Sequence, residues 1–370
     1  MGIPEFGDEK IKCVQKEKEA LLRLKGEFLD VPGRISSWGN EGYKQYCCRW
    51  RGVDCDDQTC NVIKLDLCGP STSSLPYFRV EPWQETMLKL PFLQVLSLPG
   101  SKLSPPVPSV LPSSNSLMSV STLDLSSNNL STSIYTWMYN FSNLTHLDLS
   151  GNALDGRTPD EVGFPRYLGN NINLKLLRVF SHRLDGQLLE IMKNLSCMID
   201  SLEYLNLQAN WIDGSLSEIV ANFTSLRELR LGRNKLNESI PKVVGELPSL
   251  IILDFSWNEI VGSVPDLFLP SLLRELYLSH NQLSGLTKFI GHLPKLEKLY
   301  LDSNQFEGTI SEVDLFKLVQ LREIDLSFNA QLHIRISSNW IPPFQLNVIR
   351  LANCKLGPHF PNGQRTQSSF

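Results

Sequence analysis

One pattern of leucine and asparagine recurs through most of the 370-residue chain, and it constrains the fold more than any other feature. Written L-x-x-L-x-L-x-x-N-x-L, it first appears cleanly at Val120 and returns at steps of mostly 23 to 25 residues. Further clean copies start at Leu144, Leu202, Leu226, Leu250, Leu273, Leu296 and Leu321, and weaker copies start at Val62, Leu93, Leu174 and Leu346. The 61 leucines and 25 asparagines of the chain are therefore periodic, and twelve repeats are predicted.

The spacing has a physical cause. Alternate residues of a strand point to opposite faces, so the fourth and sixth positions of each copy place their leucines inward. A single short strand cannot bury those leucines, whereas stacked neighbours can, so the repeats are expected to form an α/β solenoid with one continuous core. The ninth-position asparagine follows the strand, and we expect its amide to pair with buried backbone groups of adjacent turns.

The second half of each repeat is also patterned. Leu154 to Pro159, Leu236 to Pro241 and Ile260 to Pro265 share the form L-x-x-x-x-P, with glycine at the third position in two of them. This form resembles the plant-specific class of leucine-rich repeats. The resemblance implies a right-handed superhelix with a parallel β-sheet on its concave face.

The residues before Val62 do not repeat, and they have the features of a cap. Ala20, Leu21, Leu24 and Phe28 recur at helical spacing, so a helix is expected over about Lys16–Leu29. The stretch from Cys47 to Cys55 reads C-C-R-W-R-G-V-D-C and resembles the amino-terminal cap of plant leucine-rich-repeat proteins. By that resemblance the disulfides are Cys13–Cys47 and Cys48–Cys55; four cysteines alone allow three connectivities. The domain organisation that follows is 1–12 leader remnant or disordered, 13–61 cap, 62–361 repeats and 362–370 truncated tail.

Disulfides and glycosylation motifs both indicate an oxidising, extracellular environment. Six asparagines head N-x-S/T sequences without an intervening proline: Asn129, Asn140, Asn143, Asn194, Asn222 and Asn237. No signal peptide is recognisable in Met1–Lys12, so a truncated start is expected. Cys354 occupies a ninth position, where a small buried residue can replace asparagine. Roles for Cys60, Cys68 and Cys197 are not assigned, although Cys60 and Cys68 are too far apart along one strand to bond each other.

Several classes of function lack support in the sequence. The formal charge is −4, which disfavours nucleic-acid binding, and no uninterrupted apolar stretch is long enough for a membrane span. No phosphate loop, dinucleotide fingerprint, zinc-protease motif or nucleophile elbow is present, so no enzyme, cofactor or metal site is predicted.

Residues predicted to point outward from the strands change character along the array. Repeats before Leu174 carry mostly serine, aspartate and threonine there, whereas later ones carry aromatic and basic residues. These candidate ligand-binding residues are Arg178, Phe180, Tyr204, Gln208, Arg230, Arg233, Trp257, Tyr277, His280, Lys298 and Tyr300. Tyrosine, tryptophan and arginine dominate binding hot spots, so a peptide or protein ligand is predicted on six strands spanning roughly 24 Å. Ordinary cross-strand pairing, such as Arg230 beside Asp254, is the alternative interpretation.

The cap and the repeats together resemble the ectodomain of plant receptor-like proteins, from Cys13 to about Pro361. The resemblance implies recognition of an extracellular ligand in defence or development, at the outer face of the plasma membrane, with a co-receptor kinase as partner. Two alternatives share the same repeat class: a secreted inhibitor of cell-wall-degrading enzymes, and the ectodomain of a receptor kinase. The family's membrane span and carboxy-terminal cap are not in this sequence, which is why a truncated product or fragment is expected.

Overall fold

The computed structural model describes residues 13–27, 33, 35–67, 83–103, 105, 119–138, 141–154, 172–265, 272–285 and 288–357. Two compact units divide the chain. Unit 1 comprises Met1–Asp160 with Arg166–His182, and unit 2 comprises Glu161–Pro165 with Arg183–Phe370. Each unit is a run of repeats, and each is described below by itself.

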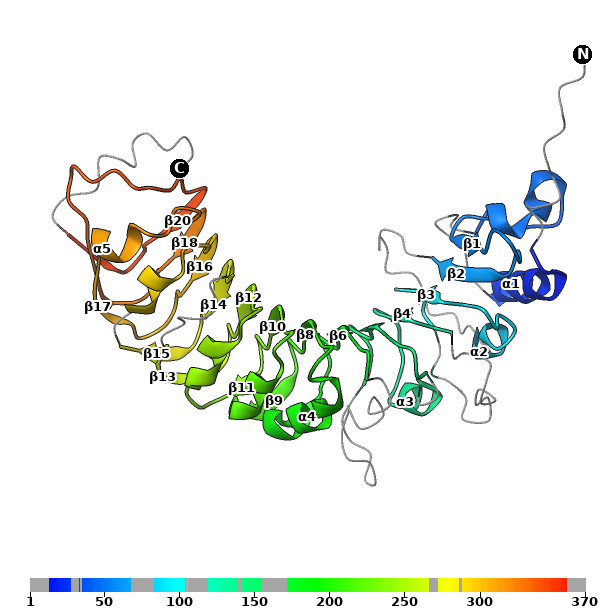
Figure 1. The fold of residues 1–370 in the computed structure, drawn as a ribbon, viewed down its shortest axis with the longest axis horizontal. Coiled ribbons are helices and arrows are strands. Elements are labelled where there is room, and N and C mark those ends of the chain that lie inside the picture. The colour runs from blue at the N-terminus through cyan, green and yellow to red at the C-terminus, as the bar shows by residue number, and fades with distance from the viewer. Residues whose placement is uncertain are drawn as a thin grey trace, which may run out of the picture. The chain divides into compact units, whose positions relative to one another are not determined.

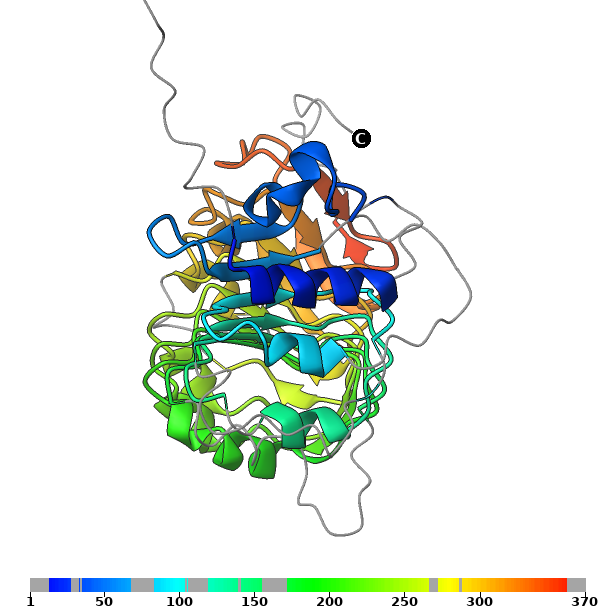
Figure 2. The ribbon, with the colours of Figure 1, turned by 90° about the vertical axis from the view of Figure 1, so that its right-hand side faces the viewer.

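Unit 1 carries the cap and the first five repeat strands. Helix α1 (Gln15–Glu27) is followed by two short 3₁₀ turns and by strand β1 (Val53–Cys55), which pairs antiparallel with β2. The sheet then continues in parallel, in the order of its strands: β2 (Val62–Asp66), β3 (Val95–Ser97), β4 (Thr122–Asp124), β5 (His146–Asp148) and β6 (Leu176–Arg178). Helices α1, α2 (Trp83–Met87) and α3 (Ser133–Met138) lie one below another in Figure 2, as successive turns of a solenoid require.

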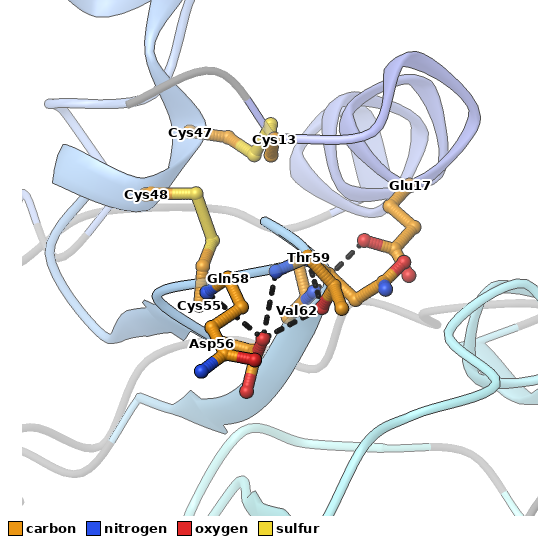
Figure 3. Close-up of a disulfide and its surroundings, with 10 residues drawn as sticks. Cys13, Glu17, Cys47, Cys48, Cys55, Asp56, Gln58, Thr59 and Val62 are labelled. Carbon is orange, nitrogen blue, oxygen red and sulfur yellow. Dashed lines mark hydrogen bonds between the residues drawn. A yellow bond between two sulfur atoms is a disulfide. The ribbon is translucent and has the colours of Figure 1, made fainter. Parts of the chain in front are cut away.

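Two disulfides hold the cap together, and they are the predicted pairs, Cys13–Cys47 and Cys48–Cys55 (Figure 3). Within the cap, Trp38 and Trp50 stack with ring centroids 5.3 Å apart, and both indoles are buried. The predicted helix is present, although it begins one residue earlier than expected, and residues 28–32 lie outside the described part of the chain.

Unit 2 carries seven further repeat strands in one parallel sheet, again in chain order. They are β8 (Tyr204–Asn206), β10 (Glu228–Arg230), β12 (Ile252–Asp254), β14 (Glu275–Tyr277), β16 (Lys298–Tyr300), β18 (Glu323–Asp325) and β20 (Val348–Arg350). Eleven of the twelve predicted repeat starts lie two residues before a strand, and the twelfth, Val62, is itself the first residue of β2. Figure 1 shows the strands of unit 2 following one another along one side of each turn.

The other sides of the turns in unit 2 hold a second set of strands and helices. A second set of parallel strands follows the asparagine positions, and helices α4 (Leu188–Asn194) and α5 (Glu312–Leu315) lie on the outside (Figure 1). The second strands are β7 (Asp185–Gln187), β9 (Trp211–Gly214), β11 (Lys235–Leu236), β13 (Val261–Ser263), β15 (Gln282–Ser284), β17 (Glu307–Ser311), β19 (Gln331–Arg335) and β21 (Lys355–Leu356).

The core and the asparagine ladder follow the predicted arrangement. Leu229 and Leu231, at the fourth and sixth positions of one repeat, are 0% and 1% exposed. In a representative ladder position, Asn304 Nδ2 donates to the carbonyl of Leu301 at 3.1 Å and to that of Leu278, in the preceding turn, at 2.9 Å. Its Oδ1 accepts from the Leu283 N–H at 3.0 Å. One amide thus satisfies three backbone groups that burial would otherwise leave unpaired.

Three repeats have another described residue at the asparagine position: Ser101, His182 and Cys354. Cys354 Sγ lies 3.0 Å from the Leu326 carbonyl, so the thiol takes the place of the asparagine donor, as predicted. His182 fills the slot in the Leu174 repeat, a substitution that the sequence did not single out. Its Nε2 lies 2.9 Å from the Leu149 carbonyl and its Nδ1 lies 2.8 Å from the Asn152 carbonyl. Burial lowers the pKa of this imidazole, although the two carbonyls favour its protonated form.

Candidate ligand-binding face

We use the term strand face for the side chains of unit 2 that point away from the core on β8 to β20 and on the turns directly after them. The structure divides the candidate residues into three groups. Tyr204, Arg230, Tyr277, Lys298 and Tyr300 lie on these strands. Four others, Gln208, Arg233, Trp257 and His280, lie two or three residues beyond the end of a strand, not on it as the sequence analysis placed them. Arg178 and Phe180 belong to unit 1, where Arg178 Nη1 lies 3.9 Å from Asp148 Oδ2.

The turn positions share an unusual backbone conformation. Arg233, Trp257 and His280 have φ values of 55°, 57° and 54°, in the left-handed region, and each immediately precedes a ladder asparagine. Such a conformation costs a non-glycine residue roughly 1 kcal/mol or more, so the surrounding fold has to impose it. The same turn occurs in every repeat of unit 2, because the chain must turn inward there to bring the asparagine into the ladder. Its side chains project from the edge of the strand face.

Three of these side chains form a stack. The Trp257 and His280 rings are stacked with centroids 3.6 Å apart and an interplanar angle of 19°. The Arg233 guanidinium lies over the same indole, 5.1 Å from its centroid. Trp257 is nevertheless 47% exposed, so a large indole surface faces solvent at a position where no core requires it. Exposed tryptophan and arginine side chains are the residue types that dominate binding interfaces.

Asp254 organises the neighbouring part of the strand face. Its buried carboxylate accepts from Gln208 Nε2 at 2.7 Å and lies 3.8 Å from Arg230 Nη1. Arg230 Nε in turn donates to Glu228 Oε1 at 2.7 Å. Arg230 and Gln208 are therefore already engaged by carboxylates of the chain itself. For these two predicted residues the cross-strand alternative describes the structure better than free ligand contact.

Gly232 makes the Gln208–Asp254 contact possible. The Gln208 side chain starts in the β8 repeat and passes over the β10 repeat to reach Asp254 in the β12 repeat. A Cβ atom at Gly232 would lie 2.9 Å from Asp254 Oδ1 and 3.1 Å from Gln208 Nε2. The absence of a side chain at this position leaves the space through which the bridge passes.

Two tyrosines form a second cluster farther along. The Tyr277 and Tyr300 ring centroids are 5.3 Å apart, and each hydroxyl donates to a glutamate: Tyr277 to Glu275 at 2.9 Å, and Tyr300 to Glu323 at 2.6 Å. Burial and the hydrogen bond to Glu323 raise the pKa of Tyr300 to about 12, and burial with the hydrogen bond to Glu275 raises that of Tyr277 further. Both phenols are neutral hydrogen-bond donors at physiological pH.

Phe328 is a further exposed aromatic residue of this face and was not among the predicted ligand-binding residues. It occupies the same left-handed turn position as Trp257, in the β18 repeat, and is 57% exposed. The signal was available, because Phe328 stands directly before the ladder residue Asn329 just as Trp257 stands before Asn258. The carboxylates of the face, such as Asp302, were also absent from the predicted set, which contains mainly aromatic and basic residues.

Five of the six predicted glycosylation sites lie within the described residues, and Asn140 lies outside them. Asn129, Asn143, Asn222 and Asn237 are exposed and Asn194 is half-buried. None of these five belongs to a strand of the main sheet in either unit; Asn194 ends helix α4, for example, and Asn237 directly follows β11. Glycans at these sites would leave the strand face uncovered.

Comparison with protein families identifies the repeat class. The model for the leucine-rich-repeat N-terminal domain matches residues 14–56. Leucine-rich-repeat models match residues 119–141, 143–164, 224–283 and 271–330, so family matches cover more than half of the chain. The receptor-like protein EIX2 of Solanum lycopersicum is 30% identical over an alignment of 517 residues that includes 100% of this chain. The chain belongs to the plant leucine-rich-repeat receptor-like proteins.

The chain spans about half the length of the receptor-like proteins it matches: 50% of EIX2, and likewise 50% of EIX1 from the same plant, to which it is 29% identical. Among solved structures, the ectodomain of the Arabidopsis thaliana receptor kinase GASSHO1/SCHENGEN3 is similar, with 27% identity and a TM-score of 0.68 over 95% of this chain and 42% of that one. That ectodomain was solved in complex with CASPARIAN STRIP INTEGRITY FACTOR 2.

The Arabidopsis receptor kinase HAESA shares the fold, with 22% identity and a TM-score of 0.57 over 95% of this chain and 67% of that one. That structure was solved with the peptide hormone IDA and the co-receptor SERK1. In the described part of this receptor-like chain, no helix combines the length and apolar character that crossing a bilayer demands.

Proposed function

We propose that the chain is the part of a plant cell-surface receptor-like protein that recognises an extracellular peptide or protein on the strand face of unit 2. The observation that carries the proposal is the Arg233–Trp257–His280 stack, since a large exposed indole held between two other side chains has no role in the core. Tyr204, Tyr277 and Tyr300 extend the aromatic surface on the strands beside it.

The size of the surface supports an extended ligand. Five strands from β8 to β16 carry the candidate residues in unit 2, and at ~4.8 Å per strand they span roughly 19 Å. That length accommodates about six residues of an extended peptide lying across the strands, at ~3.3 Å each. The positions of the described glycosylation motifs support the same assignment, because they leave this surface free.

The cell-surface location and the partners belong to the same proposal. Receptor-like proteins and the ectodomain of GASSHO1/SCHENGEN3 are related to this chain, and the two cap disulfides require an oxidising compartment. We place the strand face outside the plasma membrane and propose glycans on the exposed sequons. Signalling in defence or development is assigned to a complex of this protein with a co-receptor kinase. No catalytic role is proposed.

Binding of displayed peptides tests the location of the site. Random seven-residue peptides are selected on the purified protein, and their dissociation constants are measured against single variants. Trp257→Ala should weaken binding by at least about 1–2 kcal/mol, the effect typical of a hot-spot aromatic residue. Ser126→Ala, in the early repeats of unit 1, is the matched control and should have no effect. Unchanged binding to Trp257→Ala together with loss of binding in Lys242→Glu, on the outer side of unit 2, would contradict the proposal.

A further inference from the structure

The strand face between β12 and β18 is richer in carboxylates than in cations. It carries Asp254, Glu275, Asp302, Glu323 and Asp325. Three of the five have a cationic partner within 4 Å: Asp254 has Arg230 at 3.8 Å, Glu275 has Lys298 at 3.1 Å, and Asp325 has Arg350 at 3.3 Å. These pairs neutralise most of the charge that the chain places there.

Asp302 and Glu323 remain uncompensated. Within the described residues, neither has a lysine or arginine within ion-pair distance. Glu323 accepts from the Tyr300 hydroxyl, and Asp302 accepts from Ser279 Oγ and lies 3.5 Å from His280 Nε2. Neutral hydroxyl donors leave both negative charges in place, so this part of the face keeps an excess of two negative charges while His280 is neutral.

Glu323 contacts the Tyr300 side chain, and Asp302 belongs to the same repeat as Tyr300; Arg350, which pairs with Asp325, also lies near the Tyr300 hydroxyl. Tyr300 bonds directly to Glu323 of the next strand, and Asp302 follows Tyr300 by two residues, on the same face of the chain. The Tyr277 ring lies beside that of Tyr300. Aromatic rings attract cations through their negative faces, and carboxylates add direct charge attraction. The aromatic rings and the carboxylates therefore both favour a ligand group that carries a positive charge, either an ammonium or a guanidinium group.

We infer that the ligand of the strand face presents a lysine or arginine side chain to the part of the face that carries Asp302, Glu323 and the Tyr277–Tyr300 pair. The inference rests on the proposed function and adds the sign of the ligand's charge: the segment that binds the strand face is a basic peptide. Arg233 lies at the opposite end of the surface, in the β10 repeat, and has no carboxylate within 4 Å among the described residues. A ligand with an acidic group at that end is the competing possibility.

Two synthetic peptides of equal length provide the probe. Fluorescein-labelled heptapeptides alternate glycine with lysine in one and glycine with glutamate in the other, and fluorescence anisotropy gives their dissociation constants at low and high salt. The lysine peptide should bind more tightly than the glutamate peptide. The double variant Asp302→Asn with Glu323→Gln should weaken lysine-peptide binding about tenfold or more at low salt, and the difference should shrink at ~1 M salt, where charges are screened beyond about 3 Å.

A matched double variant controls for overall charge. Glu246→Gln with Glu259→Gln removes two exposed carboxylates of unit 2 that lie outside the β12–β18 strands, and it should change lysine-peptide affinity less than about twofold. Equal losses in both double variants, or tighter binding of the glutamate peptide, would overturn the inference. If Trp257→Ala still weakens binding of the selected peptides in that case, the strand face remains the site and only the charge assignment fails. Circular dichroism melting of each variant confirms that the protein is folded.

Discussion

Glu17 Oε2, on the first turn of the cap helix α1, accepts a hydrogen bond from the backbone N–H of Val62 at 2.8 Å, across 45 positions of sequence (Figure 3). Val62 is the first residue of β2, the strand on which the first repeat is built. This carboxylate, which is only 2% exposed, therefore joins the cap to the solenoid beside the antiparallel pairing of β1 with β2. Its second oxygen, Oε1, is buried without a hydrogen-bond partner among the described residues.

The first prediction concerns this contact. Glu17→Ala leaves the Val62 N–H buried and unpaired and should lower the free energy of unfolding by about 1–3 kcal/mol. Burial raises the pKa of Glu17, so its contribution to stability is greatest below its unfolded pKa and is lost as pH rises through the folded value. Glu17→Gln keeps an acceptor for Val62 and removes the titration. The stability of Glu17→Gln relative to wild type should therefore rise between pH 4 and pH 7 in urea melts; a constant difference would contradict the prediction.

A second prediction concerns His182, in the ladder. The lowered pKa of its imidazole means that its contribution is present above the unfolded pKa, near 6.5, and is lost as pH falls. His182→Asn should restore a ladder amide and remove this loss, so the variant should gain stability over wild type as the pH is lowered from 7 to 5. Chemical denaturation at the two pH values measures the effect. His182→Ala, which also lacks the titration but offers no ladder amide, should be less stable than His182→Asn by about 1 kcal/mol or more.

A third prediction tests the bridge over Gly232. Gly232→Ala should break the Gln208–Asp254 hydrogen bond and destabilise the protein by about 1–3 kcal/mol, since the bond involves a charged acceptor. Gly26→Ala is the control, because a Cβ there meets no atom within 4 Å and helix α1 should tolerate or gain from alanine. If Gly232→Ala melts at the wild-type temperature, the bridge does not constrain the face.

The fourth prediction compares the two disulfides. Cys13–Cys47 spans 34 residues and Cys48–Cys55 spans 7. On the chain-entropy account the longer loop contributes about 1.4 kcal/mol more, so Cys13→Ser should be the more destabilising change and Cys48→Ser the milder one. Secretion yield and thermal melting rank the variants. Mass mapping that finds Cys13 or Cys48 as a free thiol in the wild-type protein would refute the pairing itself.

The fifth prediction concerns the last described repeats. An apolar cavity of about 50 Å³ lies there, lined by Ile324, Leu346, Ile349 and their neighbours, and Leu356 is 47% exposed. Amide hydrogen exchange should therefore be faster at β20 than at β10, whose central Leu229 is fully buried. Equal protection at both strands would show that the cavity does not weaken this end.

The sequence by itself determined the architecture. A leucine at every second strand position and an asparagine at the ninth position fix the strand, the buried side and the ladder, because these requirements repeat in every turn and depend on local spacing. Twelve strands occur where the pattern placed them. The cap pairing was implied by a resemblance to a family and is confirmed in the structure.

Only the tertiary structure decided which outward residues are available to a ligand. Arg230 and Gln208 looked equivalent to Trp257 in the sequence, yet both are held by Asp254, which stands 24 and 46 positions away from them. Neighbours on the strand face come from different repeats, so the choice of partner depends on side-chain reach and on gaps such as the one at Gly232. The left-handed turn that presents Trp257 and Phe328 is likewise imposed by the ladder. The hydrophobic pattern does not predict this backbone conformation.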